Sequence, residues 1–263
     1  MSGVVLIPVV VYVVLYLGAP WLLAVSTLIT FLALSELNGL GLHKKRDGAF
    51  DLIGAVTGAV CVPLVFYCGM EAIVPALVGL VFLYLFYGLL SKRGLVDASM
   101  DASHKVLGIA YLALPLSFLT ILAEFEQGRL WLLFLLVVIW SNDTFAYFIG
   151  KNLGKHKLAP VISPRKTIEG AVGGIIGGAL VGIVFVHFTG LSARLVETAA
   201  ITVVIGLVAM IGDLAESLIK RAANVKDSGT IIPGHGGVLD RIDSLIFPVP
   251  LLYFYLLMRA FYA

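Results

Sequence analysis

The strongest constraint on the fold of this chain is a series of long apolar runs that recurs along almost its whole length. Uninterrupted apolar stretches of roughly 17–25 residues can cross the hydrocarbon core of a bilayer as α-helices. We predict nine such helices, over residues 3–17, 20–38, 51–69, 72–90, 105–124, 129–149, 168–189, 196–222 and 245–262. The expected fold class is therefore all-α, a polytopic integral membrane helical bundle with about nine transmembrane helices.

The composition supports this fold class. The chain is 60% hydrophobic and only 13% charged, whereas soluble domains carry about 25% charged residues. No linker or separable soluble domain interrupts the sequence. We therefore expect one integrated membrane domain, with scaffold helices over residues 1–125 and a catalytic region over residues 126–263, where most of the candidate functional polar groups lie.

The distribution of basic residues predicts the orientation. Of the 18 Lys and Arg residues, all but Arg129, Arg194 and Arg259 lie in or beside loops that follow even-numbered predicted helices. Basic loops remain in the cytoplasm by the positive-inside rule. We thus expect a multi-pass protein of the cell (inner) membrane, with its N-terminus outside. The cytoplasmic loops would be residues 39–50, 91–104, 150–167 and 223–243.

The seventh predicted helix carries a regular glycine stripe. Gly170, Gly174, Gly178 and Gly182 recur at intervals of four, a spacing that lets a second helix approach closely in a membrane. The partner can be another helix of the same subunit or the same helix of a homodimer. The sequence leaves both options open.

The segment from Ser217 to Asp243 is unusually polar for this chain. Carboxylates can hold a divalent metal, while cations and glycine amides can hold phosphates. Both kinds of group occur here: Lys220, Arg221, Lys226, Asp227, His235, Gly236, Gly237, Asp240, Arg241 and Asp243. The segment is therefore the expected centre of the chemistry.

The spacing of these residues resembles that of a known family. The pattern is Ser217-x-x-Lys220-Arg221, then Lys226-Asp227, then Pro233-x-His235-Gly236-Gly237-x-x-Asp240-Arg241-x-Asp243. It resembles the C-terminal motif of phosphatidate cytidylyltransferases, the CDP-diacylglycerol synthases, and residues 141–143 and 163–170 are also similar to that family. The resemblance implies a transferase of phospholipid biosynthesis that converts CTP and phosphatidate to CDP-diacylglycerol and pyrophosphate.

A polar stripe on the eighth predicted helix points to the same region. Asp213, Glu216, Ser217 and Lys220 have offsets of three, four and seven, which place them on one helical face. Ionisable residues inside a span are costly and usually face a cavity or a partner. The alternative is purely structural: Lys220 forms an ion pair with Asp213 or Glu216 that only stabilises the packing of the helices.

The carboxylates predict a magnesium site. Asp240 and Asp243 lie three residues apart at the start of the last predicted helix and can converge on one site, although Asp243 could instead cap that helix. We expect Asp213 and Asp240 to hold Mg²⁺, assisted by Asp243 or Asp143, with a second cation as an option. The resemblance also implies that Asp143 is a site residue. Alternatively, the Asp143 carboxylate only forms hydrogen bonds with neighbouring polar groups. Hard oxygen ligands favour Mg²⁺ over Zn²⁺.

The segment before the seventh helix is the second candidate phosphate site. Ser163, Arg165 and Lys166 precede a helix expected to start near Ile168, whose N-terminal amides can bind an anion. The alternative is that these residues form a capping box for the helix. For His235, likewise, the alternative to phosphate binding is that it stabilises the glycine-rich turn in which it lies. The expected substrate-binding residues are Ser163, Arg165, Lys166, Ser217, Arg221, Lys226, His235, Gly236, Gly237 and Arg241. The expected catalytic residues are Asp143, Asp213, Lys220, Asp240 and Asp243.

The expected partners are CTP, phosphatidate and membrane lipids, with no nucleic acid. Two other functions stay open. A CTP-dependent kinase of polyprenol or another lipid would need a base and would consume the γ-phosphate. An ion-coupled secondary transporter also uses intramembrane Asp and Lys with Gly-rich spans, but here the ionisable groups cluster towards one face of the membrane rather than at its midplane.

Overall fold

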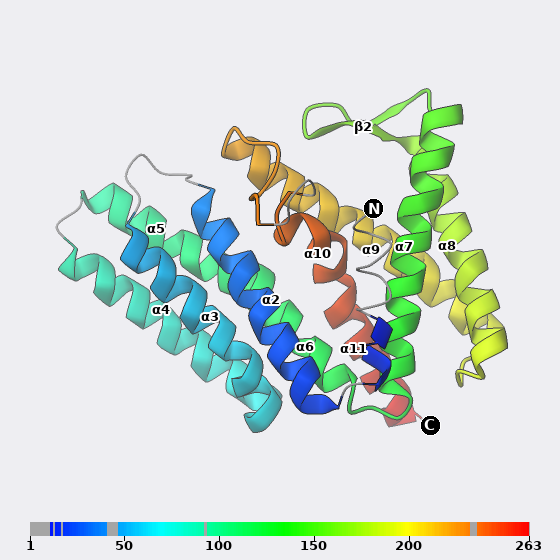
Figure 1. Ribbon diagram of the computed structural model, residues 1–263, viewed down its shortest axis with the longest axis horizontal. Helices are drawn as coiled ribbons and strands as arrows, with labels where there is room; N and C mark the ends of the chain where they lie inside the picture. The colour runs from blue at the N-terminus through cyan, green and yellow to red at the C-terminus, as the bar shows by residue number, and fades with distance from the viewer. Residues whose placement is uncertain are drawn as a thin grey trace.

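A computed structural model of the protein describes residues 11–12, 14–16, 18–40, 47–91, 94–231 and 236–262. Within this described part, eight helices are long and apolar enough to cross a membrane. They confirm the predicted all-α membrane bundle (Figure 1). The first predicted helix, residues 3–17, lies largely outside the described residues, and its described positions are helical.

The elements follow one another in a simple order. They are α2 (Ala19–Gly39), α3 (Gly48–Cys68), η1 (Met70–Ala72), α4 (Ile73–Leu90), α5 (Leu95–Gly108), η2 (Ile109–Ala113), α6 (Leu114–Leu122), α7 (Gly128–Leu153), β1 (Lys157–Ala159), β2 (Ser163–Thr167), α8 (Ile168–Thr189), α9 (Leu195–Ala222), α10 (Leu239–Ile246) and α11 (Pro248–Tyr262). The turns η1 and η2 continue into neighbouring helices, so Met70–Leu90 and Leu95–Leu122 each form one span.

The predicted loop over residues 91–104 is wrong, because α5 begins at Leu95. Its polar residues suggested a loop, but His104 of this segment and the adjacent Lys105 are buried with partners inside the bundle. Lys105 Nζ lies 2.6 Å from Asp51 Oδ1 on α3, and His104 Nε2 lies 3.1 Å from the Leu37 carbonyl oxygen on α2. Pairing of this kind allows a polar helical turn to be buried.

The last span also differs from the prediction, because it begins at Leu239 and is broken into α10 and α11. The break falls at Pro248, which has no backbone N–H and cannot continue the hydrogen-bond pattern of α10. Asp240 and Asp243 consequently lie within α10. Val238 occupies the N-cap position of that helix, so Asp243 does not cap it.

The basic segment between α7 and α8 is more regular than expected. α7 continues to Leu153, and β1 then pairs antiparallel with β2, with Lys157 opposite Thr167. The hairpin stands at the end of α7 (Figure 1). Thr167 Oγ1 accepts a hydrogen bond from Gly170 N at 3.1 Å, which caps α8 and confirms the predicted helix start at Ile168.

Two hydrophobic cores hold the bundle together. One contains Trp131 of α7, Ile205 of α9 and Leu252 of α11. The other contains Leu37 of α2 and Leu239 of α10, together with residues of α3 and η2. Because α10 belongs to the second core and α11 to the first, the broken last span joins the two.

The glycine stripe of α8 is used within the subunit. A side chain on Gly174 would meet the Asn142 backbone oxygen of α7 at 2.7 Å, and one on Gly178 would meet the Val138 backbone oxygen at 3.3 Å. The buried glycines therefore let α7 and α8 approach closely. The expected option of a homodimer through this stripe is not supported, because the face is already covered.

We expect Gly174→Ala to destabilise the protein, because the added methyl group meets backbone that cannot move freely. Overpacking of this kind costs about 1–3 kcal/mol. Thermal unfolding in detergent measures the effect. Gly79→Ala is the matched control, since Gly79 is exposed on α4 and a Cβ there has nothing within 4 Å. Equal melting temperatures for the two variants would contradict the proposed helix contact.

Candidate active site

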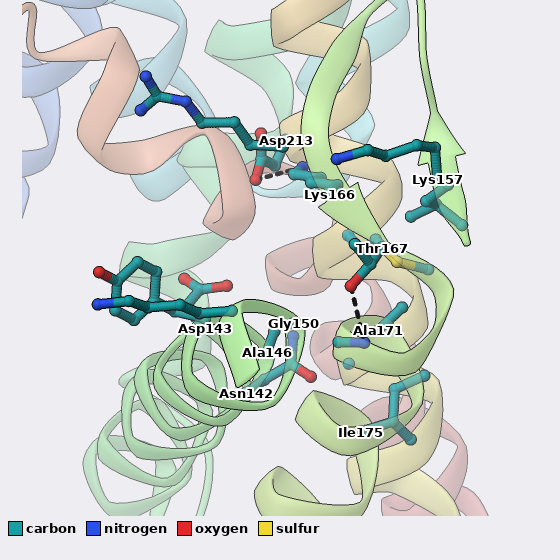
Figure 2. Close-up of a pocket in the computed structure, with 17 residues that line it drawn as sticks. Asn142, Asp143, Ala146, Gly150, Lys157, Lys166, Thr167, Ala171, Ile175 and Asp213 are labelled. Atoms are coloured by element: carbon teal, nitrogen blue, oxygen red, sulfur yellow. Dashed lines mark hydrogen bonds and ion pairs between the residues drawn. The ribbon is translucent and has the colours of Figure 1, made fainter. Parts of the chain in front are cut away.

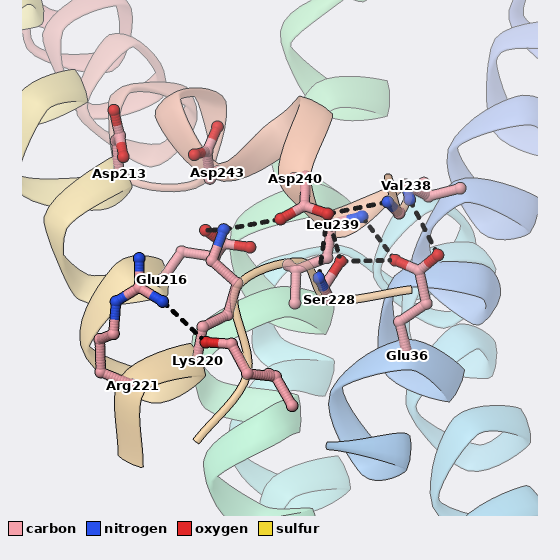
Figure 3. A network of polar contacts seen from close by, with 12 residues as sticks. Glu36, Asp213, Glu216, Lys220, Arg221, Ser228, Val238, Leu239, Asp240 and Asp243 are labelled. Atoms are coloured by element: carbon pink, nitrogen blue, oxygen red, sulfur yellow. Dashed lines mark hydrogen bonds and ion pairs between the residues drawn. The ribbon is translucent and has the colours of Figure 1, made fainter. Parts of the chain in front are cut away.

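The polar residues singled out in the sequence gather at one end of the bundle. This end is formed by the C-terminal halves of α7 and α9, the hairpin, the N-terminus of α8 and the short helix α10 (Figures 2 and 3). α9 contributes Asp213, Glu216 and Lys220, while α10 contributes Asp240 and Asp243. Segments far apart in the sequence thus form one polar region.

A cavity of about 630 Å³ opens between α7, α8, α9 and the hairpin. Such a volume is typical of sites for small molecules and cofactors. Its polar part is lined by Asp143, Lys151, Lys157, Arg165, Lys166 and Asp213. Its other part is lined by small and apolar residues: Gly170, Ala171, Ile175, Gly206 and Met210. The cavity therefore offers charged groups and an apolar surface to the same ligand.

The cavity brings together two residues for which the sequence analysis predicted different roles. Lys166 Nζ of β2 lies 2.5 Å from Asp213 Oδ2 of α9, and both side chains are partly exposed (Figure 2). The expected phosphate ligand and the expected metal ligand are therefore ion-paired with each other. This pair ties the hairpin to the middle of the polar region.

Lys220 is the centre of a second, more buried charge cluster. Its ammonium group lies 2.6 Å from Asp240 Oδ1 and also pairs with Glu216, one turn earlier on α9. The Glu216 side chain is only 1% exposed. The alternative pairing of Lys220 with Glu216 is thus present, but Lys220 also connects α9 to α10. The cluster therefore links two helices and does not only stabilise α9.

The second oxygen of Asp240 organises the loop before α10. Asp240 Oδ2 accepts hydrogen bonds from Ser228 N and Ser228 Oγ, both at 3.0 Å, and from Gly237 N at 2.8 Å (Figure 3). Gly236 has a φ of 80°, a conformation that favours glycine. Of the glycine-rich turn, the structure describes Gly236 and Gly237, and the Gly237 amide donates to a protein carboxylate.

Glu36 of α2 is a site residue that the sequence interpretation missed. Its carboxylate accepts hydrogen bonds from Ser228 Oγ at 3.1 Å, Val238 N at 2.9 Å and Leu239 N at 2.8 Å (Figure 3). A side chain on Gly237 would collide with Glu36 and Ser228. Glu36 therefore fixes both the loop and the start of α10. An acid near the end of an apolar span was the available signal.

Three further carboxylates lie close together on the other side of Asp240. Asp243 is near enough to both Asp213 and Asp143 for the three to interact electrostatically. Asp213 and Asp243 are neighbours in Figure 3, whereas Asp240 turns towards Lys220. Asp243 Oδ1 accepts a hydrogen bond from Ser244 N at 2.7 Å. Three different helices, α7, α9 and α10, thus supply an acidic cluster.

The predicted metal pair of Asp213 and Asp240 remains a prediction. Among the described residues, no three His, Cys, Asp or Glu side chains are arranged to hold one metal ion. Mg²⁺ does not need such a set, because it usually binds one or two carboxylates, several waters and substrate phosphates. Both oxygens of Asp240 already have protein partners, which makes Asp243 the better placed companion of Asp213.

The remaining expected phosphate ligands have varied surroundings. Arg221 donates to the carbonyl oxygens of Ile162 at 3.3 Å and Val225 at 2.9 Å, so it holds the hairpin and the end of α9. Lys226 and Arg241 are exposed. Ser163 and Ser217 are half-buried at the same end of the bundle, outside the cavity lining, and His235 lies outside the described residues.

Two further cations line the cavity, Lys151 and Lys157. The sequence analysis used them only to predict the membrane orientation. Lys151 extends from the last turn of α7, where its ammonium group lies 5.8 Å from the Tyr147 ring centroid. Lys157 extends from β1 and lines the same cavity. Together with Arg165 and Lys166, they surround the polar part of the cavity with positive charge. Their neighbourhood depends on the hairpin, which the sequence did not predict.

Fold and site together define a class: a multi-pass helical membrane protein with carboxylates and cations clustered at one end of the bundle. The Cytidylyltransferase family model matches residues 1–259. A phosphatidate cytidylyltransferase of Staphylococcus saprophyticus is 38% identical over 242 residues, which is 91% of each chain. One from Staphylococcus haemolyticus is 36% identical over the same shares, and one from Staphylococcus epidermidis is 42% identical over 176 residues, covering 67% of this chain and 66% of that relative. The chain therefore belongs to the cytidylyltransferase family.

We expect Glu36→Ala to lower turnover at least tenfold, because Val238 N and Leu239 N lose their acceptor and the Ser228 hydroxyl keeps only Asp240. Each buried donor left without a partner costs about 1–3 kcal/mol. Glu36→Gln keeps one acceptor oxygen and should fall between Ala and wild type. The measurement is turnover per folded protein, with folding checked by thermal unfolding.

Asp51→Asn is the matched control for this test. Asp51 is also a largely buried acid of the N-terminal helices, but its carboxylate pairs with Lys105 of α5. This variant should lose stability while the folded fraction keeps its turnover. Glu36 would be only a structural residue if both variants lost activity in proportion to their loss of stability.

Proposed function

We propose that this protein transfers the cytidylyl group of CTP to phosphatidate and releases pyrophosphate, forming CDP-diacylglycerol. The observation that carries the proposal is the cavity between α7, α8 and α9, in which four cations and two carboxylates adjoin an apolar lining. A triphosphate requires the first kind of surface and a lipid the second. Membership of the cytidylyltransferase family supports the same reaction.

The reaction needs no nucleophile from the protein. A phosphate oxygen of phosphatidate attacks the α-phosphorus of CTP, a new P–O bond forms, and the bond to the β-phosphate oxygen breaks. Both reactants are anions and repel each other. The protein therefore has to align them and to neutralise charge on the α-phosphate and the departing pyrophosphate.

The cavity cations suit the triphosphate. Lys151, Lys157, Arg165 and Lys166 approach from α7 and from both strands of the hairpin. Cationic side chains from several directions can neutralise phosphate oxygens and fix their orientation. Lys166 also neutralises Asp213. When Asp213 binds a cation, Lys166 becomes available to a phosphate.

The acidic cluster fits a divalent cation. Asp213 and Asp243, with Asp143 beside them, are hard oxygen donors from three helices. We assign Mg²⁺ to Asp213 and Asp243, and we assign Asp240 the role of holding Lys220 and the loop. When bound, Mg²⁺ stabilises negative charge on phosphate oxygens. The charge of Asp143 leaves a second cation as an option.

The two rival functions make different use of CTP. A lipid kinase would place the γ-phosphate on the lipid, and a transporter would leave CTP intact. We expect purified protein, given CTP labelled at the α-phosphorus and phosphatidate vesicles, to place the label in the lipid. Label supplied at the γ-phosphorus should appear in pyrophosphate. A γ-label in the lipid would replace the proposal with the kinase function.

We expect Asp213→Asn and Asp243→Asn to raise the Mg²⁺ concentration for half-maximal activity at least tenfold, because each removes half of the proposed metal pair. A tenfold change corresponds to about 1.4 kcal/mol. Asp240→Asn should instead lower turnover at saturating Mg²⁺, since it removes the negative charge that pairs with Lys220. A Mg²⁺ titration of the three variants separates the roles. A shift with Asp240→Asn alone would restore Asp240 as the ligand.

We also propose that the site faces the cytoplasm of a cell whose inner membrane holds the protein. The basic loops and the need for cytoplasmic CTP support this orientation. α8 has 22 residues and is about 33 Å long, so its two ends lie on opposite sides of a bilayer.

Single cysteines in a Cys61→Ser, Cys68→Ser background test the orientation. On intact cells, a membrane-impermeant maleimide should label Ser192→Cys, beyond the C-terminal end of α8. Val161→Cys, in the hairpin turn and 88% exposed, should react only after the cells are opened. Labelling of Val161→Cys from outside would place the cavity on the wrong side for CTP.

A further inference from the structure

Tyr111 is a buried residue of the N-terminal helices that reaches the acidic cluster. It lies in η2, a five-residue π-helical turn between α5 and α6. Pro115, four residues later, has no N–H to donate to the Tyr111 carbonyl, which accounts for the irregular turn. Single π-helical turns inside α-helices are frequent at functional sites. Tyr111 therefore lies in a π-helical turn and not in a regular α-helix.

Packing holds the aromatic ring of Tyr111 against the last span. Its ring meets the Phe247 ring edge-on, with centroids 5.9 Å apart and planes at 81°. It also shares a hydrophobic core with Ile242 and Ile246 of α10. The residue is only 7% exposed. Phe247 lies beyond Asp243 along the span, so the ring approaches the acidic cluster from the interior of the membrane.

The hydroxyl group of Tyr111 has no hydrogen-bond partner among the described residues. It is nevertheless close enough to Glu216, Asp243 and Asp213 to interact electrostatically with all three. A buried hydroxyl without a partner costs about 1–3 kcal/mol, and most buried polar groups have one. A tyrosine kept only for packing would be more stable as phenylalanine.

The surroundings decide which kind of ligand suits this hydroxyl. An O–H group donates to an acceptor, and the neighbouring carboxylates disfavour a bare anion unless donors and cations offset their charge. Lys220 is the protein cation beside Glu216. Tyr111 adds a neutral donor on the membrane side of the same cluster. A phosphate oxygen beside the acidic cluster would accept the hydrogen bond of the Tyr111 hydroxyl. Lys220 would offset part of the negative charge around it.

We propose that the Tyr111 hydroxyl donates a hydrogen bond to a phosphate oxygen of a substrate bound at the acidic cluster, which makes Tyr111 a substrate-binding residue. The inference rests on the proposed cytidylyl transfer. The phosphate can belong to phosphatidate, which reaches the site from the membrane, or to CTP. Tyr111 thereby brings the N-terminal helices into direct contact with substrate.

Tyr111→Phe tests this role, because it removes only the oxygen and keeps the ring against Phe247. The measurements are KM and kcat for each substrate with the purified protein in phosphatidate vesicles, and thermal unfolding without substrate. We expect a loss in kcat/KM of about ten- to a hundredfold, the range for one hydrogen bond to a charged group. The melting temperature should stay equal or rise. A higher KM for phosphatidate assigns the phosphate to the lipid, and a higher KM for CTP assigns it to the nucleotide.

Tyr84→Phe is the matched control. Tyr84 is fully buried, but its hydroxyl lies 2.6 Å from Thr57 Oγ1, away from the site. This variant should lose stability and keep the wild-type kinetic constants. Wild-type kinetics in Tyr111→Phe would overturn the inference while leaving the proposed reaction intact. Loss of the reaction in the wild-type protein would instead refute the proposed function.

Discussion

The ion pair between Lys220 and Asp240 is the contact on which the arrangement of the polar region depends. A bilayer cannot solvate charged groups, so Lys220 and the almost fully buried Glu216 have to find partners inside the bundle. Asp240 of α10 is the second carboxylate that pairs with Lys220, and its other oxygen accepts hydrogen bonds from the backbone N–H groups of Ser228 and Gly237. α10 is thereby held beside α9, in a position that brings Asp243 near Asp213.

The N-terminal helices complete this arrangement, although they look like scaffold in the sequence. Glu36 secures the start of α10 from α2, and Tyr111 approaches the acidic cluster from η2. Tyr111 and Leu239, which donates to Glu36, both belong to the second hydrophobic core. A site beside this core can receive a charged nucleotide from the polar end and a lipid from between helices. An amphipathic substrate requires this combination of surfaces.

Much of the fold followed from the length of the apolar runs, because a span has to cover the hydrocarbon thickness whatever its neighbours are. The polar motif also indicated where Lys220, Asp240 and Asp243 would gather. Glu36 could not be assigned in this way, since its partner Leu239 lies 203 residues away. Tyr111 could not be assigned to the site either, because it is an uncharged residue within an apolar run. The loop expected over 91–104 failed because buried partners of Lys105 and His104 permit a polar helix.

Our central proposal is that Asp240 positions α10 so that Asp213 and Asp243, and not Asp240, bind Mg²⁺. Anomalous scattering from a crystal of the wild-type protein grown with Mn²⁺ and CTP measures this directly. The account predicts one peak in contact with the carboxylates of Asp213 and Asp243, with Lys220 still paired to Asp240. A peak bound to Asp240, with Lys220 displaced, would contradict it.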